Sequence, residues 1–358
     1  MKAILVIPSL EAGGAERVVS ILAKNWVNDD IDIEIILLTK AKIFYDLDPR
    51  IKITQFDYKI NLKGFKKLFS LLKLAFLFRK HLKGSNPNFV LSFMNKYNVF
   101  TLISLIGLKI KTIVSERDSP TEVLPKITKY LRNKTYRFAD GIICQSNLSK
   151  NYIIRMTGNN NVISVANPIA RDKNFINGNI TDKENIILNV GRLVPKKGQK
   201  YLIDAFSKLK NKDWELFFIG DGPLKSELME FAKLLNIEDR VHFIGFSKNV
   251  EQWFSKSKIF AFPSVLEGYP NALAEAMVNG MACVSFDCNT GPNDIIKNGE
   301  NGFLIEERNV KELTDKIEYL INNQDHMIEF STEAVKLYES VNPKYICDEY
   351  FNFCNYNS

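Results

Sequence analysis

Residues that build metal sites and disulfides are scarce in this sequence. Among 358 residues there are three histidines and five cysteines, and the cysteines form no Cys-x-x-Cys pair. Zinc sites and disulfide frameworks both need such residues in close, patterned groups. We therefore predict no metal site and no metal cofactor, and we expect reduced thiols in a cytoplasmic protein.

Long apolar runs are also missing. A helix that crosses a bilayer needs about 20 mostly apolar residues, whereas the run 98–108 is too short and Lys73 interrupts the run 68–78. The first eight residues, Met1-Lys-Ala-Ile-Leu-Val-Ile-Pro8, are typical of a strand and not of a signal peptide. We expect a protein that is not integral to a membrane.

Acidic residues are absent from one long stretch. Residues 58–115 contain eleven Lys or Arg and no Asp or Glu. Residues 1–170 carry 26 basic against 13 acidic side chains (+13), whereas 171–358 carry 22 against 28 (−6). This asymmetry indicates an anionic partner of the first half, which could be a lipid surface, a diphosphate-bearing acceptor or nucleic acid. No motif in which aromatic and basic residues alternate supports nucleic acid.

The basic stretch contains a predicted helix, residues 61–83. One broad face of it is apolar, with Leu62, Phe65, Phe69, Leu72 and Phe76. Basic side chains lie largely elsewhere, among them Lys63, Lys66, Lys67 and Lys73. Such a helix can attach to an anionic membrane surface, or it can be a core helix with a solvated basic back. The sequence leaves both interpretations open.

Apolar runs alternate with helical stretches along the whole chain, which predicts α/β domains with parallel sheets. We expect a first domain over 1–170, a polar connector over 171–184 and a second domain over 185–341. An aromatic-rich helix is expected over 342–358.

The stretch 262–280 contains two carboxylates in a distinctive setting. A buried strand ends at Phe262, a loop follows, and Asn271 is predicted to cap a helix that runs to Gly280. Glu267 then lies in the loop and Glu275 one turn inside the helix. A helix start at the carboxyl edge of a parallel sheet suits a phosphate, which leaves the two carboxylates for hydroxyl groups. The pattern predicts a nucleotide-sugar site.

Residues 264–288, in which seven residues separate Glu267 from Glu275, resemble the signature of family 4 retaining glycosyltransferases. Further blocks match in the same order: Gly13-Gly14-Ala15-Glu16, Val190-Gly191-Arg192 with Lys197-Gly198, Ile219-Gly220-Asp221-Gly222-Pro223, and Val241-His242-Phe243-Ile244-Gly245. The resemblance covers nearly the whole chain. It implies the GT-B fold, in which two doubly wound Rossmann-like domains face each other across a cleft and a C-terminal helix crosses back to the first domain.

The resemblance also implies roles for individual residues. Glu267, Arg192 and Lys197 are the expected catalytic residues: Glu267 holds sugar hydroxyls, and the two cations stabilise the leaving diphosphate. Donor-binding positions would be Gly14, Gly191, Gly222, Ile244, Phe246, Gly268, Tyr269, Pro270, Asn271, Ala272 and Glu275. No protein nucleophile and no metal are needed in the family mechanism.

Acceptor-side residues are expected in the first domain. Gly13 lies in the loop after the first strand, and Glu116 and Arg117 follow another strand. Many members of the family carry a His in the second loop, where this sequence has Arg117. A structural salt pair between Glu116 and Arg117 is an open alternative.

The function that this resemblance implies is transfer of a hexose or N-acetylhexosamine from a UDP-sugar to a saccharide acceptor, in the branch that builds bacterial capsule, O-antigen or related glycans. The basic first half favours an acceptor on a lipid diphosphate and a peripheral position on the inner face of the cell membrane. Two alternatives stay open: a nucleotide-sugar epimerase of the same fold, and an inactive sugar-nucleotide-binding protein. The sequence does not specify the sugar.

Overall fold

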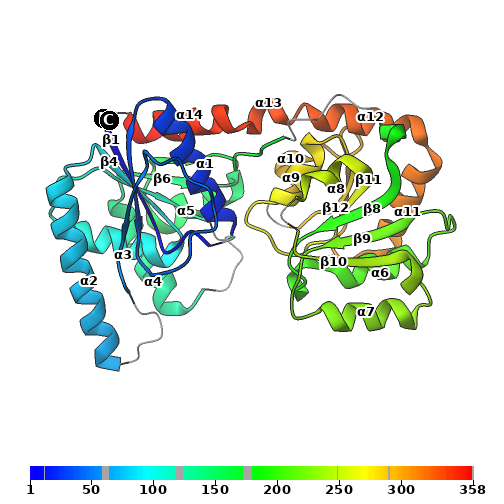
Figure 1. The fold of residues 1–358 in the computed structure, drawn as a ribbon, viewed down its shortest axis with the longest axis horizontal. Coiled ribbons are helices and arrows are strands. Elements are labelled where there is room, and N and C mark those ends of the chain that lie inside the picture. The colour runs from blue at the N-terminus through cyan, green and yellow to red at the C-terminus, as the bar shows by residue number, and fades with distance from the viewer. Residues whose placement is uncertain are drawn as a thin grey trace. The chain divides into compact units, whose positions relative to one another are not determined.

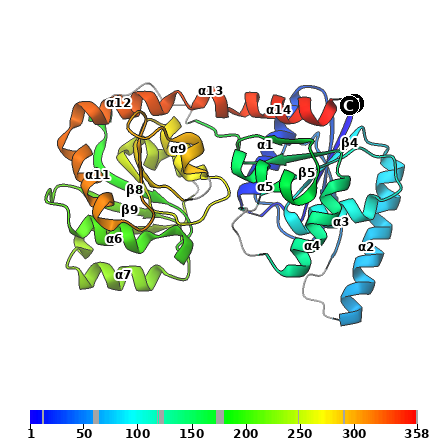
Figure 2. The ribbon, with the colours of Figure 1, turned by 180° about the vertical axis from the view of Figure 1, so that it is seen from behind.

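The computed structural model describes residues 1–11, 13–58, 64–117, 119, 124–171, 180–247, 249–288 and 291–356 (Figures 1 and 2). The chain forms two compact units. Unit 1 comprises residues 1–168 and 343–358, and unit 2 comprises residues 169–342.

Unit 1 is built on a seven-stranded parallel sheet with the strand order β3-β2-β1-β4-β5-β6-β7. Its strands are β1 (Lys2–Ile7), β2 (Asp32–Leu37), β3 (Lys52–Gln55), β4 (Phe89–Phe93), β5 (Thr112–Ser115), β6 (Gly141–Cys144) and β7 (Val162–Ser164). Its helices are α1 (Gly14–Asn28), α2 (Gly64–Ser85), α3 (Asn95–Leu105), α4 (Lys126–Thr135), α5 (Asn147–Thr157) and α14 (Pro343–Asn355). Residues 3–7 of β1 are fully buried, as expected for a central parallel strand covered on both faces.

The last helix, α14, belongs to unit 1. The indole N–H of Trp26 in α1 donates to the carbonyl of Cys347 in α14 at 3.0 Å. The Trp26 ring also packs edge-on against Phe89 and Phe351. The prediction that the C-terminal helix returns to the first domain is confirmed.

Unit 2 is built on a six-stranded parallel sheet with the order β10-β9-β8-β11-β12-β13. Its strands are β8 (Glu184–Val190), β9 (Glu215–Ile219), β10 (Val241–Gly245), β11 (Ser257–Phe262), β12 (Ala282–Phe286) and β13 (Phe303–Ile305). Its helices are α6 (Gln199–Ser207), α7 (Lys225–Leu234), α8 (Glu251–Lys256), α9 (Asn271–Val278), α10 (Pro292–Ile295), α11 (Val310–Asn322), α12 (Gln324–Val335) and α13 (Tyr338–Val341).

Both sheets have a point at which the strand order reverses. In unit 1 it lies between β1 and β4, and in unit 2 it lies between β8 and β11. Ligands of open α/β sheets bind beyond the carboxyl ends of the strands at such a point. The loops after these four strands are therefore where functional residues are to be sought.

Helix α2 packs on unit 1 with a side that the sequence did not single out. Phe78 and Leu82 are buried against the sheet and α3, and Leu74 is buried on the same side, whereas the predicted apolar face is exposed. The exposed members are Phe65, Phe69, Leu72 and Phe76. Leu62 and Lys63 lie outside the described residues, and the side chain of Lys67 is likewise not described. Within the described residues, no helix is both long and apolar enough to cross a membrane.

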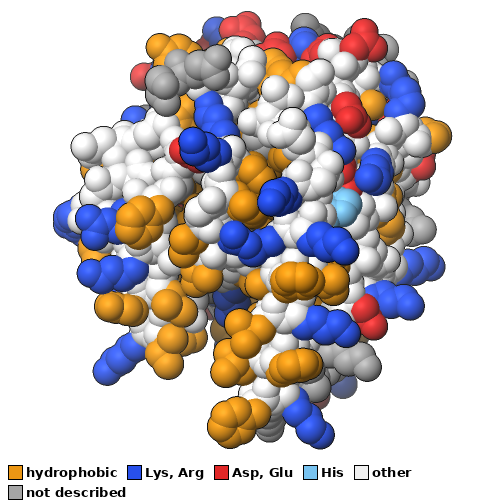
Figure 3. Space-filling view, turned by 90° about the vertical axis from the view of Figure 1, so that its left-hand side faces the viewer, with side chains coloured by type: hydrophobic (Ala, Val, Ile, Leu, Met, Phe, Trp, Pro, Cys, Tyr) orange, Lys and Arg blue, Asp and Glu red, His pale blue; other side chains and the backbone are white. Residues whose placement is uncertain are grey.

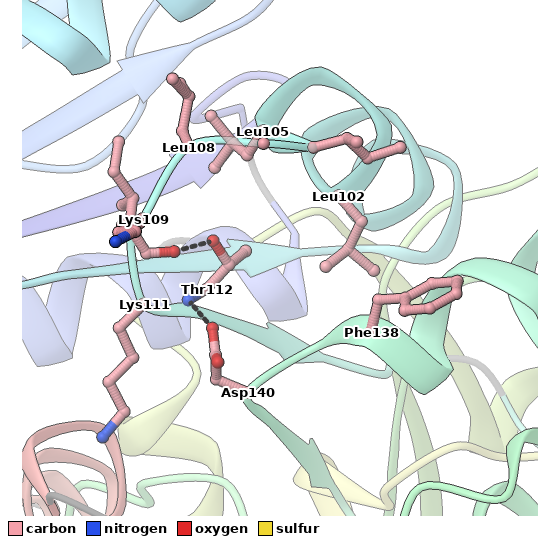
Figure 4. A pocket seen from close by; sticks show the side chains of 11 residues that line it. Leu102, Leu105, Leu108, Lys109, Lys111, Thr112, Phe138 and Asp140 are labelled. Atoms are coloured by element: carbon pink, nitrogen blue, oxygen red, sulfur yellow. Dashed lines mark hydrogen bonds between the residues drawn. The ribbon is translucent and has the colours of Figure 1, made fainter.

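A cavity of about 520 Å³ lies at the amino end of the strands of the unit 1 sheet, opposite the carboxyl end with its switch-point loops (Figure 4). Its lining includes Lys109, Lys111 and Thr112, around the start of β5, and the Thr112 amide donates to Asp140 Oδ2 at 2.6 Å. Because this is the amino end of the strand, the cavity is separate from the switch point of unit 1.

Candidate functional site

Three loops of unit 2 are pressed together at the carboxyl edge of its sheet. Gly198, after β8, has a φ of +67°, and a Cβ there would lie 2.0 Å from the carbonyl oxygen of Pro263, after β11. A Cβ on Gly222, after β9, would lie 2.3 Å from the carbonyl oxygen of Leu193. Only glycine permits both contacts. The glycines of the predicted phosphate loops thus bring the loop backbones close together.

The close packing brings Lys197 and Glu267 together. Lys197 Nζ donates to Glu267 Oε1 at 2.6 Å, and the ammonium lies 5.5 Å from the centre of the Phe262 ring. The side chains are 21% and 9% exposed, respectively. These two residues are 70 positions apart in the sequence, and they come from the two strands that flank the switch point. An ammonium and a carboxylate in contact here can bind a phosphate and a sugar hydroxyl side by side.

The helix that follows Glu267 begins differently from the prediction. Asn271 is the first residue of α9 and Pro270 is its N-cap, with no side-chain capping bond. The prediction that Asn271 caps the helix is therefore wrong. The Asn271 amide donates to the carbonyl of Tyr269 at 3.0 Å, a tight turn that starts the helix one residue earlier. Glu275 is buried within the first turns of α9.

Residues 268–272 form the rim of this site. Gly268, Asn271 and Ala272 are partly exposed, so their backbone can reach a ligand. Tyr269 is instead buried, its hydroxyl has no hydrogen-bond partner among the described residues, and burial together with Asp294 raises its pKa.

Arg192 lies on the exposed side of the β8 loop. Within the described part of the chain its side chain makes no hydrogen bond or ion pair. Its carbonyl accepts a hydrogen bond from Gln199 Nε2 at 3.2 Å. Gln199 is buried and anchors the Gly191–Arg192 backbone, a positioning contact that the sequence did not indicate. The guanidinium is thus available to an anionic ligand.

The predicted base-binding strand, β10, is an edge strand of its sheet. Ile244 and Phe246 expose 43% and 63% of their surface. Their backbone and side chains can therefore contact a ligand. His242 stacks on Phe217, with ring centres 4.4 Å apart, which agrees with a structural role.

In unit 1 the side chain of Tyr45 holds the backbone of Gly13, after β1. Tyr45 Oη donates to the carbonyl of Gly13 at 2.7 Å, and the Gly13 amide donates back at 3.2 Å. A Cβ on residue 13 would lie 2.2 Å from a carboxylate oxygen of Glu16, whose pKa is raised by burial. Gly14 is the first residue of α1. The contact with Tyr45 was not foreseen, because no local pattern links residues 13 and 45.

Glu116 and Arg117 point to different partners. The Arg117 guanidinium donates to Asn167 Oδ1 and, at 3.1 Å, to Tyr350 Oη of α14. It also lies 5.2 Å from the centre of the Phe93 ring, and burial lowers its pKa. Buried Glu116 accepts a hydrogen bond from Asn95 Nδ2 at 3.3 Å. Arg117 thus ties α14 to the sheet, and its acceptor-side role stays a prediction.

Metal-binding residues do not gather in the described parts of the chain. No group of three or more His, Cys, Asp or Glu residues there could hold a metal ion. All five cysteines are buried, and none of them forms a disulfide with another.

Two protein-family models match the chain. Residues 12–173 match the model for Glycosyltransferase Family 4, and residues 170–337 match that for Glycosyl transferases group 1. An uncharacterized glycosyltransferase of Haemophilus influenzae is 30% identical over 95% of each chain. The chain belongs to the family 4 glycosyltransferases. The predicted resemblance is confirmed.

A second relative of this glycosyltransferase has a specific name. N-acetylgalactosamine-N,N'-diacetylbacillosaminyl-diphospho-undecaprenol 4-alpha-N-acetylgalactosaminyltransferase of Campylobacter jejuni is 31% identical over 84% of this chain and 85% of the relative. The amylovoran biosynthesis glycosyltransferase AmsD of Erwinia amylovora is 26% identical over 96% of each chain. Bacterial relatives of this enzyme thus act in polysaccharide and glycan biosynthesis.

Solved structures confirm the predicted GT-B fold with its two Rossmann-like domains. The glycosyltransferase of Rickettsia africae superposes with a TM-score of 0.85 at 18% identity, covering 100% of this chain and 99% of the other. Anabaena HepE in complex with UDP superposes with a TM-score of 0.82 at 19% identity, covering 98% of each chain. At these identities the likeness concerns the fold alone.

Proposed function

We propose that this glycosyltransferase moves a hexose or N-acetylhexosamine from a UDP-sugar to a saccharide carried on a lipid diphosphate, with retention of anomeric configuration and without a metal ion. The observation that carries the proposal is the pair of Lys197 and Glu267, 2.6 Å apart at the switch point of unit 2. It offers a cation to the leaving diphosphate and a carboxylate to the transferred sugar at one place.

The pair gives each residue a role. Arg192 and Lys197 stabilise the negative charge that grows on the departing diphosphate. Fixed charges lower the barrier most when they are already in position before the reaction begins. Glu267 accepts hydrogen bonds from sugar hydroxyls. Lys197 and Glu267 are in contact, so a phosphate oxygen that binds the ammonium shares it with the carboxylate, and the pair orients the diphosphate relative to the sugar.

The remaining donor contacts come from the rim of the site. The backbone at Gly268 and Ala272 supports the sugar and phosphate at the start of α9, where unpaired amide groups and the helix dipole favour an anion. Glu275 binds the ribose hydroxyls, and the edge strand at Ile244 and Phe246 binds the base. The acceptor hydroxyl attacks the face from which the diphosphate leaves and passes its proton to a leaving phosphate oxygen.

Names of relatives support the donor and the acceptor. The Campylobacter relative is named as a transferase of N-acetylgalactosamine to a diphospho-undecaprenol glycan, and the Anabaena structure holds UDP. The +13 charge of residues 1–170 suits a diphosphate and an anionic bilayer. We therefore place the enzyme in the cytoplasm, on the inner face of the cell membrane, with Lys63, Lys66, Lys67 and Lys73 near the lipid head groups.

Donor consumption tests the proposal. The purified protein is incubated in EDTA with UDP-galactose, UDP-glucose, their N-acetylamino forms or GDP-mannose, together with a membrane lipid extract. We expect turnover of one UDP-sugar, a large loss in Glu267→Ala, and full activity in the control Glu329→Ala, which changes an exposed carboxylate of α12 in the same unit.

Either of two results would contradict the proposal. If Glu267→Ala turns over the donor as fast as the wild type, the carboxylate does not hold the sugar. If EDTA abolishes turnover and Mg²⁺ or Mn²⁺ restores it, the fixed cations are not sufficient for the leaving group. The anomeric configuration of the product, read by NMR, decides whether transfer is retaining.

A further inference from the structure

Helix α2 has two apolar sides; among the residues that the structure describes, one side is buried in unit 1 and the other is exposed. Phe65, Phe69, Leu72 and Phe76 are 90%, 72%, 61% and 66% exposed. At about 100° per residue they lie on one side of the helix, opposite the buried Leu74, Phe78 and Leu82. Figures 1 and 2 show that the start of α2 extends beyond the rest of unit 1. Such a row of exposed large apolar side chains marks a surface that binds an apolar partner.

A second helix of unit 1 also exposes apolar side chains. In α4, Ile127 and Tyr130 are 75% and 62% exposed, with Lys126 and Lys129 beside them in the sequence. Figure 3 shows hydrophobic side chains interleaved with Lys and Arg on this face of the molecule, with a hollow between two groups of them. Apolar tips among cations are typical of surfaces that enter the head-group region of an anionic bilayer.

A cavity of about 350 Å³ lies between α2, α3 and α4. Leu71 and Leu74 of α2, Phe100 of α3 and Leu131 of α4 are among the residues that line it, and Lys96 and Tyr97 supply polar groups. Its volume is within the range of small-ligand pockets. A largely apolar cavity with one cation at its wall suits a hydrocarbon chain that carries an anionic head.

Lys96 places this cavity next to the switch point of unit 1, where the acceptor is expected to bind. Lys96 is in the first turn of α3, directly after β4, at the switch point of unit 1. Met94, between β4 and α3, has a φ of +71°, which is uncommon for a residue with a side chain. The Gly13–Gly14 loop after β1 lies on the same edge of the sheet. A head group at Lys96 would therefore lie at the edge where the acceptor sugar is needed.

We propose that the cavity between α2, α3 and α4 is the site for the isoprenoid chain of the acceptor, and that Lys96 binds its diphosphate. This deepens the proposed function and rests on it, since it assigns a binding site to the lipid part of the acceptor. The exposed side of α2 lies in the membrane from which the chain enters. A second copy of the chain fits this surface poorly, because a symmetric contact would bring the same lysines face to face.

Titration of the full-length protein with farnesyl diphosphate, inorganic diphosphate and UDP tests this site. We expect farnesyl diphosphate to bind at least tenfold more tightly than inorganic diphosphate, because only the former fills the cavity. Thr128→Trp, on the cavity wall, should weaken the binding of farnesyl diphosphate at least tenfold. Thr135→Trp, two turns along α4 and outside the lining, is the matched control and should leave it unchanged.

Lys96→Gln separates the head group from the chain. It should weaken the binding of farnesyl diphosphate and leave the weaker binding of farnesol unchanged. Equal affinity for inorganic and farnesyl diphosphate, or unchanged binding in Thr128→Trp, would overturn the proposal. So would formation of dimers by the wild type that Phe69→Ser abolishes, since the surface would then bind a second copy.

UDP titration keeps the two proposals distinguishable. Wild-type protein that binds UDP and consumes a UDP-sugar but does not prefer farnesyl diphosphate contradicts the lipid site alone. Protein that binds farnesyl diphosphate but neither UDP nor a UDP-sugar contradicts the transferase proposal instead. The Thr128→Trp variant should bind UDP as the wild type does, which also shows that it is folded.

Discussion

Gly198 sets the distance between Lys197 and Glu267, and Gly198→Ala tests that relation. At a φ of +67° a side chain costs about 1–2 kcal/mol of stability. The new Cβ would also lie 2.0 Å from the carbonyl oxygen of Pro263, whereas real Cβ contacts stay above 3.0 Å. The two loops must therefore separate by about 1 Å, the difference between these distances. Transmitted to the ion pair, this lengthens the 2.6 Å contact to about 3.6 Å, beyond hydrogen-bonding range.

A displacement of about 1 Å in a catalytic site lowers the rate by on the order of 10²-fold. We therefore expect kcat for UDP-sugar consumption to fall about 100-fold in Gly198→Ala. The matched control is Gly299→Ala in the same unit, where φ is +82° and no atom lies within 4 Å of the added Cβ. Its free energy of unfolding, measured in urea, should fall by about 1–2 kcal/mol, because a side chain in the left-handed region is strained. Its kcat should stay at the wild-type value.

The comparison between the two variants decides the matter. Equal kcat in Gly198→Ala and Gly299→Ala, at equal stability, would refute the reasoning that the glycine holds the pair in place. A fall in both would assign the loss to stability and not to geometry.

Two further predictions concern unit 1. Fully buried Glu34 accepts hydrogen bonds from Thr54 (2.6 Å) and His81 (2.7 Å); burial raises its pKa, but these bonds outweigh burial and lower it overall. Its stabilisation is therefore present above the unfolded pKa, about 4.5, and is lost as pH falls through the lower folded value. Glu34→Gln should lower the free energy of unfolding by about 1–3 kcal/mol at pH 7 and flatten its acid limb; an unchanged acid limb would contradict this. Replacing Lys63, Lys66, Lys67 and Lys73 by Gln should weaken binding to phosphatidylserine vesicles, since each lysine contributes about 1 kcal/mol. The control is a variant in which four exposed lysines of unit 2 are replaced by Gln. If the α2 variant sediments with vesicles as much as this control does, attachment through α2 is contradicted.

Much of the fold follows from the sequence because parallel strands have a local signature. The apolar run at residues 3–7 and the run ending at Phe262 are buried on both faces, so their composition alone marks them as central strands. The return of α14 to the first unit was predictable only through the resemblance to the family. The contacts that hold it, between Trp26 and Cys347 and between Arg117 and Tyr350, join residues hundreds of positions apart.

The candidate site was predictable in its residue types but not in its contacts. Glycines and charged residues after strands, together with the resemblance to the family, make Gly198, Lys197 and Glu267 candidates, since phosphate loops need both close backbone and fixed charge. The direct contact of Lys197 with Glu267 depends on the order of β8 and β11 in the sheet, which no local pattern contains. The same holds for Tyr45 at Gly13.

The sequence by itself determined the family, the two α/β units and the loops in which chemistry is to be sought, because those depend on periodicity and on short motifs. The tertiary structure alone decided which side of α2 is buried. Both sides are apolar, so periodicity could not choose between Phe65, Phe69 and Phe76 on one side and Leu74 and Phe78 on the other. The choice depends on where the sheet and α3 lie, and it leaves an apolar, basic surface exposed beside the switch point of unit 1.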